Sequence, residues 1–103
     1  MNAAANSNIH LEGRVAVVTG GAGGIGRATA RLLAQSGAKV FVGDLRLPDE
    51  NRQLFSDLGI VGRNCDVRRE ESIRELIDLA VDDSGRLDIL VNNAGVGMVK
   101  QIV

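Results

Sequence analysis

The sequence predicts an α/β fold built on a parallel, doubly wound sheet. Short apolar segments that suit buried strands alternate with longer segments of helical periodicity, and most are bounded by glycines. This alternation is typical of a parallel sheet whose helices are crossover connections. Right-handed crossovers, with the fourth strand returning to the other side of the first, give the strand order 3-2-1-4. We expect the sheet to be truncated after that fourth strand.

Four apolar segments predict the strands. Val-Ala-Val-Val at 15–18 is a continuous apolar run, as expected for a strand that is buried on both faces. KVFVGD at 39–44 is a second run of this kind, and a more polar segment at 60–65 predicts the third strand. LDILVN at 87–92 predicts the fourth, which ends where the sequence turns to NNAG.

Three segments between the strands predict helices. The first spans residues 24–36, and its apolar residues at helical spacing predict the face that meets the sheet: Ile25, Ala28, Leu32 and Leu33. The second begins at Pro48 and ends before Gly59, and the third begins near Glu70 and ends before Gly85. The third carries the clearest apolar stripe: Ile73, Leu76, Ile77, Ala80 and Val81.

Composition narrows the function. Apolar residues make up 45% of the 103 residues and the net charge is -1, so nothing suggests a nucleic-acid or acidic-membrane partner. No apolar run suits a membrane span or a secretory signal, and we expect a cytoplasmic protein.

We expect residues 1–10 to form a disordered tail and residues 11–103 to fold. Cys65 is expected to be a small buried side chain, and no spacing of residues suggests a metal site.

The segment TGGAGGIG at 19–26 carries the strongest functional signal. It holds five glycines between the first strand and the first helix, where free N–H groups and the helix dipole attract an anion. Glycines let a pyrophosphate approach the backbone, and Asp44, at the end of the second strand, can accept hydrogen bonds from ribose hydroxyls. The alternative is that the glycines only make a tight turn and pack the helix on the strand.

Three segments resemble motifs of the short-chain dehydrogenase/reductase family. TGGAGGIG resembles its Thr-Gly-x-x-x-Gly-x-Gly motif, CDV at 65–67 resembles the adenine-contacting segment after the third strand, and NNAG at 92–95 resembles the motif at the end of the fourth. The resemblance covers residues 11–97 and is specific, because the motifs occur in the right order at plausible spacings. It implies a Rossmann-type fold and an oxidoreductase that uses NAD in preference to NADP.

The resemblance also implies roles for individual residues. Asp44 would hold the adenosine ribose and select NAD, Leu45 would flank the adenine, and Asn92 would tie the fourth strand to its neighbour. The glycine turn would line the pyrophosphate and ribose, Asp66 and Val67 would contact the adenine, and the segment after Asn92 would pass beneath the riboses. The full set of expected cofactor contacts is Gly20, Gly21, Gly23, Gly24, Ile25, Gly26, Asp44, Leu45, Asp66, Val67, Asn93, Ala94 and Gly95.

Some of these residues have simpler interpretations. Asp66 could be only the N-cap of the third helix. The two asparagines of NNAG could serve only as turn residues. Arg46, two residues after Asp44, could admit the 2′-phosphate of NADP, although a carboxylate at the strand end itself favours NAD.

The family's catalytic Tyr, Lys, Ser and Asn would follow the NNAG segment. This chain contains no Tyr, and none of its serines occupies the matching position, so we predict no catalytic residue and no activity of the chain alone. We expect the N-terminal half of an NAD-dependent short-chain oxidoreductase, whose longer form is a homo-oligomer that acts on a small alcohol or carbonyl. The alternatives are a non-catalytic dinucleotide-binding or interaction module and a non-functional truncated product.

Overall fold

The computed structural model describes residues 10–93, so most of the expected N-terminal tail lies outside the described residues. Strands and helices alternate strictly along this part of the chain. Their bounds are β1 Val15–Thr19, α1 Gly24–Gln35, β2 Lys39–Asp44, α2 Asp49–Leu58, β3 Val61–Asn64, α3 Glu70–Ser84 and β4 Ile89–Asn92. The alternation predicted from the sequence is therefore confirmed for every element.

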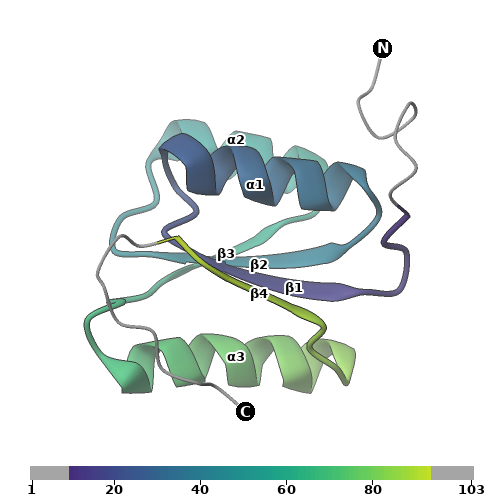
Figure 1. Ribbon diagram of the computed structural model, residues 1–103. Helices are drawn as coiled ribbons and strands as arrows, with labels where there is room; N and C mark the ends of the chain where they lie inside the picture. The colour runs from purple at the N-terminus through teal and green to yellow at the C-terminus, as the bar shows by residue number, and fades with distance from the viewer. Residues whose placement is uncertain (1–9, 94–103) are drawn as a thin grey trace.

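The four strands form one parallel sheet in the order β3-β2-β1-β4, as predicted. Helices α1 and α2 cover one face of the sheet and α3 covers the other (Figure 1). The strand order reverses between β1 and β4. At this switch point the connecting helices change from one face of the sheet to the other. The carboxyl ends of the strands meet at one edge, with Thr19 in register with both Gly43 and Asn92, and Asp44 with Asn64.

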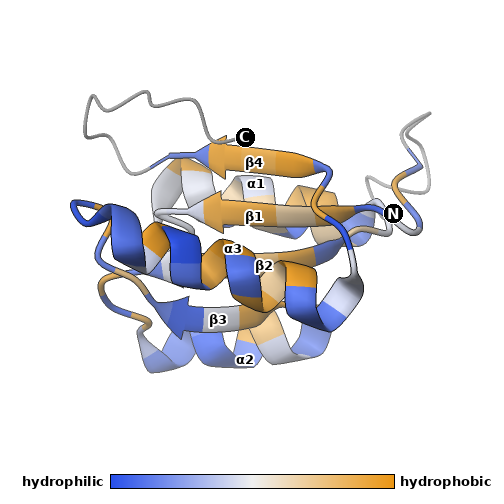
Figure 2. Ribbon diagram, turned by 90° about the horizontal axis from the view of Figure 1, so that it is seen from below, coloured by the Kyte–Doolittle hydropathy of each residue, from blue (hydrophilic) through white to orange (hydrophobic). Residues whose placement is uncertain are grey.

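The core consists of two layers, one on each face of the sheet. Alternate residues of β1 point to opposite faces, and all five residues of this strand are buried. On the side of α1 and α2 the buried cluster includes Val18, Val42 and Phe55, whereas on the side of α3 it includes Phe41 and Leu76. Figure 2 shows the apolar colour continuing along β1 and β4, with α3 lying across the sheet.

The buried face of α1 differs from the predicted one. Gly26 and Ala30 are buried, whereas Ile25 is 76% and Leu32 44% exposed. Small residues at the contact let the helix lie close to the sheet, and only the Leu33 side of the predicted stripe packs against the core. In α3, Ile73, Leu76 and Ala80 of the predicted stripe pack on the sheet together with Leu79, which was not predicted. Val81 is 39% exposed. Strands β3 and β4 are each shorter than predicted.

Within residues 10–93, no helix is both long enough and apolar enough to cross a bilayer. The same residues contain no group of three or more His, Cys, Asp or Glu side chains placed to hold a metal ion.

Candidate functional site

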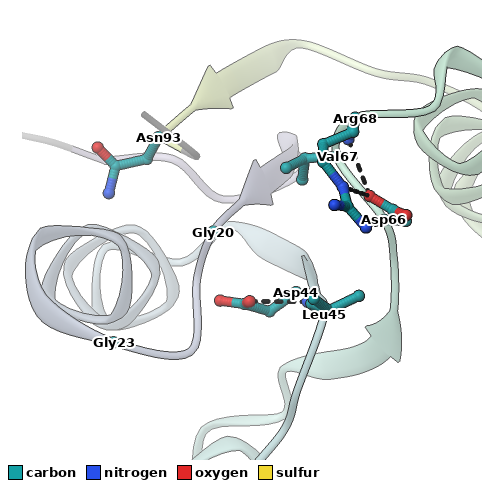
Figure 3. Close-up of a pocket in the computed structure, with 8 residues that line it drawn as sticks. All are labelled: Gly20, Gly23, Asp44, Leu45, Asp66, Val67, Arg68 and Asn93. Atoms are coloured by element: carbon teal, nitrogen blue, oxygen red, sulfur yellow. Dashed lines mark hydrogen bonds and ion pairs between the residues drawn. The ribbon is translucent and has the colours of Figure 1, made fainter. Parts of the chain in front are cut away.

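A cavity of about 430 Å³ opens at the edge where the strands end. It receives residues from four segments that are far apart in the sequence: the turn after β1, the end of β2, the loop after β3 and the residue after β4 (Figure 3). Its lining is Gly20, Gly23, Asp44, Leu45, Asp66, Val67, Arg68 and Asn93. The cavity therefore lies at the switch point of the sheet, the usual ligand site of an open α/β fold.

The turn between β1 and α1 needs glycine at several positions for different reasons. Gly20 and Gly24 adopt positive φ angles of 70° and 54°, which other residues rarely adopt. A Cβ on Gly26 would collide with the carbonyl oxygen of Gly20, because helix and turn lie in direct contact there. Gly21 is buried, and a Cβ on it would collide with the side chain of Val42.

The start of α1 presents its backbone to the cavity. Gly23 is the N-cap residue and has no side chain, so within residues 10–93 the helix start has no side-chain cap. The first turn of α1 carries no acidic residue that would offset the positive end of the helix dipole. A Cβ on Gly23 would meet nothing within 4 Å, so the space beside this residue is open. The free N–H groups and the positive end of the helix dipole therefore make the start of α1 suitable for binding an anion.

Asp44 lies between the glycine turn and the loop after β3 (Figure 3). Its Oδ2 accepts a hydrogen bond of 3.0 Å from the Ala22 backbone N–H, and its Oδ1 accepts one of 2.7 Å from the N–H of Leu45. Each carboxylate oxygen has a second lone pair, so both can still accept a hydrogen bond from a hydroxyl group of a ligand. Leu45 is 58% exposed at the cavity and offers an apolar surface beside the carboxylate.

Asp66 and Arg68 form a bidentate ion pair at the opposite wall. Arg68 Nε lies 3.0 Å from Asp66 Oδ1, and Arg68 Nη2 lies 3.1 Å from Oδ2. These hydrogen bonds hold the pKa of Asp66 below its usual value, so the carboxylate is ionised at neutral pH. The N-cap of α3 is Arg69, and Asp66 instead caps the turn before the helix through the Arg68 N–H. The interpretation of Asp66 as the helix N-cap is therefore wrong.

The last residue of β4, Asn92, and the residue after it, Asn93, have different surroundings. Asn92 Oδ1 accepts a 2.8 Å hydrogen bond from Thr19 Oγ1, which ties the ends of β4 and β1 together as expected. Asn93 donates its backbone N–H to the Thr19 carbonyl at 3.1 Å, and its side chain lines the cavity. Parallel pairing of β1 with β4 thus continues beyond the last strand residue.

Seven of the expected cofactor contacts lie in the cavity lining. Four others, Gly21, Gly24, Ile25 and Gly26, lie in or beside the glycine turn but outside the lining, and Ala94 and Gly95 lie outside the described residues. The sequence interpretation missed Arg68, although a cation two residues after Asp66 was a usable signal. It also missed Asn51, a buried residue of α2 that bonds to the turn, because nothing distinguishes it among the polar residues of that helix.

A parallel sheet with a glycine-rich turn at its switch point is typical of dinucleotide-binding proteins. Residues 14–103 match the sequence profile of a family described as short chain dehydrogenase. The chain therefore belongs to this family of oxidoreductases, which use a nicotinamide dinucleotide. It is 43% identical over 100 residues to tropinone reductase-like 2 of Erythroxylum coca, and 44% identical over 87 residues to the mitochondrial borneol dehydrogenase of Lavandula x intermedia.

Solved structures agree with this assignment. A short chain dehydrogenase from Mycobacterium smegmatis superposes with a TM-score of 0.76 at 41% identity, over 89% of this chain and 41% of that protein. A hydroxysteroid dehydrogenase from Escherichia coli gives a TM-score of 0.76 at 36% identity. The chain spans about a third of the curated relatives, because the matches cover 35% of the Erythroxylum protein and 33% of the Lavandula protein.

Proposed function

We propose that this chain is the NAD-binding part of an oxidoreductase that transfers a hydride between NAD and an alcohol or carbonyl substrate. The observation that carries the proposal is the position of the Asp44 carboxylate, which shares one cavity with the uncapped start of α1. The N–H groups at a helix start bind a pyrophosphate, and a carboxylate beside them accepts hydrogen bonds from the hydroxyls of an unphosphorylated ribose. The names of the relatives, a reductase-like protein and a borneol dehydrogenase, support an alcohol or carbonyl as the reacting group.

Each part of the cofactor has a proposed partner. The pyrophosphate lies at Gly23 and the first N–H groups of α1, and the adenosine ribose lies against Asp44. The adenine ring lies between the Leu45 side chain and the loop that carries Asp66 and Val67, with the ionised Asp66 accepting a hydrogen bond from the adenine amino group. Asn93, which lines the cavity, lies beneath the riboses, whereas the contacts expected of Ala94 and Gly95 fall outside the described residues.

The other glycines and Ile25 support this arrangement in two ways. Gly21 and Gly26 bring strand and helix close enough to form the turn, since a Cβ on either would collide with a neighbour. Gly24 supplies the positive φ at the first residue of the helix. Ile25 is 76% exposed in the first turn, and covering it with a ligand removes apolar surface from water.

The cofactor supplies the hydride, and the residues of this chain bind and orient it. Hydride transfer also needs a group that moves a proton, and we infer that this group is not among the 103 residues, which include no Tyr. The chain alone therefore shows no NAD-linked alcohol oxidation. Turnover above the background of a mock purification would contradict this inference.

The preference for NAD over NADP follows from charge. The 2′-phosphate of NADP would lie beside Asp44, where two negative groups repel one another. Arg46 is exposed and is not part of the cavity lining, which supports the preference for NAD. The dinucleotide site is therefore proposed for NAD.

A pair of substitutions at Gly23 tests the proposal. Asp at an N-cap position stabilises a helix, so Gly23→Asp leaves the free energy of unfolding equal or higher, yet its carboxylate occupies the proposed phosphate position. We expect the 103-residue chain to bind NAD, and Gly23→Asp to weaken this binding at least about tenfold, or ~1.4 kcal/mol. Gly23→Ser caps the helix without adding a charge, so it should weaken NAD binding less than Gly23→Asp does.

Calorimetric titration with NAD measures the affinities, and urea unfolding measures the stability of each variant. Wild-type protein that is folded and does not bind NAD would overturn the proposed function. Equal NAD affinity of wild type and Gly23→Asp would overturn the assignment of the phosphate position.

A further inference from the structure

Asn51 is a buried polar residue that joins α2 to the glycine turn. It is 1% exposed although it belongs to a helix whose other polar residues face water. Its Nδ2 donates a hydrogen bond to the carbonyl oxygen of Ala22, and its Oδ1 accepts a 3.1 Å hydrogen bond from Arg27 Nη1. One side chain thus connects α2, the glycine-rich turn and the first turn of α1.

The orientation of the Asn51 amide is fixed by chemistry. A guanidinium can only donate, so the amide oxygen must face Arg27 and the amide nitrogen must face the turn. The acceptor that this nitrogen finds is the carbonyl oxygen of Ala22, a residue of the turn between β1 and α1. Because the amide is buried, loss of either hydrogen bond leaves an unsatisfied polar group and costs free energy.

The hydrogen bonds to Ala22 fix two successive peptide planes. In a trans peptide the carbonyl of one residue and the N–H of the next point in opposite directions. When Asn51 holds the Ala22 carbonyl, it also fixes the direction of the Gly23 N–H. Asp44 holds the Ala22 N–H in the same way and fixes the Gly21 carbonyl. The glycine-rich turn is therefore held by a side chain on each side of Ala22.

We propose that Asn51 is a positioning residue for the pyrophosphate of the cofactor. It holds the Ala22 carbonyl away from the phosphate position, so that the Gly23 N–H faces the cavity which Gly23 lines. A turn with this many glycines loses much conformational entropy when it orders around a ligand, and a fixed turn loses less. A carbonyl turned toward the phosphates would instead repel them. This inference rests on the proposed binding of NAD.

The test compares two ligands that share the adenosine moiety. ADP-ribose contains the pyrophosphate and adenosine does not, so a defect of the phosphate position weakens only the first. Asn51→Asp keeps the shape of the side chain but removes the donor and places a negative oxygen against the Ala22 carbonyl. We expect it to weaken ADP-ribose binding at least tenfold and to change adenosine binding less than twofold.

Gln53→Glu is the matched control, because it makes the same amide-to-acid change on the same helix at an exposed position that contacts Asp57. It should leave the affinity for both ligands within twofold. A general loss of stability would lower binding of both ligands in Asn51→Asp, and urea unfolding identifies that case. Equal ADP-ribose affinity of wild type and a folded Asn51→Asp would overturn the inference.

A measurement on wild-type protein keeps the proposal testable if Asn51→Asp does not fold. The amide resonance of Gly23 in a nitrogen–proton NMR spectrum should shift when ADP-ribose is added and stay unchanged when adenosine is added. No shift of that resonance at saturating ADP-ribose would overturn the positioning role and the phosphate position at Gly23, while binding of ADP-ribose would still support a dinucleotide site. Absence of binding by both ligands to folded wild-type protein would overturn the proposed function, and this inference with it.

Discussion

Gly26 in α1 lies directly against the backbone carbonyl of Gly20 in the preceding turn. A Cβ on Gly26 would overlap that carbonyl oxygen and would stand 2.8 Å from Nδ2 of Asn93. The contact joins the end of β1, the start of α1 and the residue after β4 at a single point. Gly26 therefore serves the assembly of the site through packing, although it does not line the cavity.

Gly26→Ala should destabilise the fold. The added methyl group meets a backbone carbonyl, which cannot move aside as a side-chain end can, and overpacking of this kind costs roughly 1–3 kcal/mol. Urea unfolding followed by circular dichroism measures the loss. Gly23→Ala is the control, because a Cβ there meets nothing within 4 Å and the Gly23 φ of -149° suits any residue. Equal unfolding midpoints of the two variants would contradict the packing role of Gly26.

Asp44→Asn should raise the affinity for NADP relative to NAD. The substitution removes the charge that opposes a 2′-phosphate and keeps one oxygen that can accept a backbone hydrogen bond. We expect the NADP-to-NAD affinity ratio to rise about tenfold, equivalent to ~1.4 kcal/mol, in competition titrations. Asp49→Asn removes a fully exposed acid at the start of α2 and should leave the ratio unchanged. Wild-type protein that binds NADP as tightly as NAD would refute the role of Asp44.

The order of strands and helices was predictable because it depends on patterns that extend over many residues. A continuous apolar run such as residues 15–18 has few interpretations, and every residue of β1 is buried as predicted. The face of α1 was less predictable. A buried Gly26 and Ala30 give a weak hydrophobic signal, whereas Ile25 and Leu32 give a strong one and remain exposed.

The residues of the candidate site also fall into those that the sequence predicted and those that it did not. Residues at a strand end or just after it, such as Asp44 and Asn93, are predictable because parallel strands bring their carboxyl ends to one edge. The role of Asn51 was not predictable from sequence, because it depends on how α2 packs over the turn. Arg68 lies between these cases, since its distance from Asp66 along the chain permits the ion pair but does not require it.

The thiol of Cys65 should react slowly in the folded protein. The side chain is 2% exposed, and burial raises the pKa of the thiol, with the carboxylate of Asp66 raising it further. Little thiolate is present at neutral pH, and the thiolate is the reactive form. Iodoacetamide labelling followed by mass spectrometry should therefore proceed only through opening of the fold, and urea should increase its rate by more than about tenfold. Rapid labelling of the native chain would show that the loop after β3 opens readily.

Asp88 should make the stability of the fold depend on pH in the acid range. Its Oδ2 accepts a 2.8 Å hydrogen bond from the Val15 N–H, and Arg86 binds both carboxylate oxygens. The hydrogen bonds from the Arg86 side chain and the Val15 N–H hold the pKa of Asp88 below its ordinary value. Since the pKa is lowered in the folded state, the stabilisation is complete above the unfolded pKa of about 3.9 and is lost as pH falls through the folded pKa.

Asp88→Asn removes this stabilisation while keeping an oxygen that can accept the Val15 N–H. The variant should therefore unfold at lower urea concentration than wild type at pH 7, and the difference should shrink as the pH falls below about 4. Urea titrations at several pH values measure this difference, and the shrinkage identifies ionisation of the carboxylate as its source. Arg86→Gln should reproduce part of the effect, because it removes the partner with the largest influence on the carboxylate. A difference between wild type and Asp88→Asn that is the same at pH 3 and pH 7 would show that the charge of Asp88 does not contribute to its link with Val15 at the start of β1.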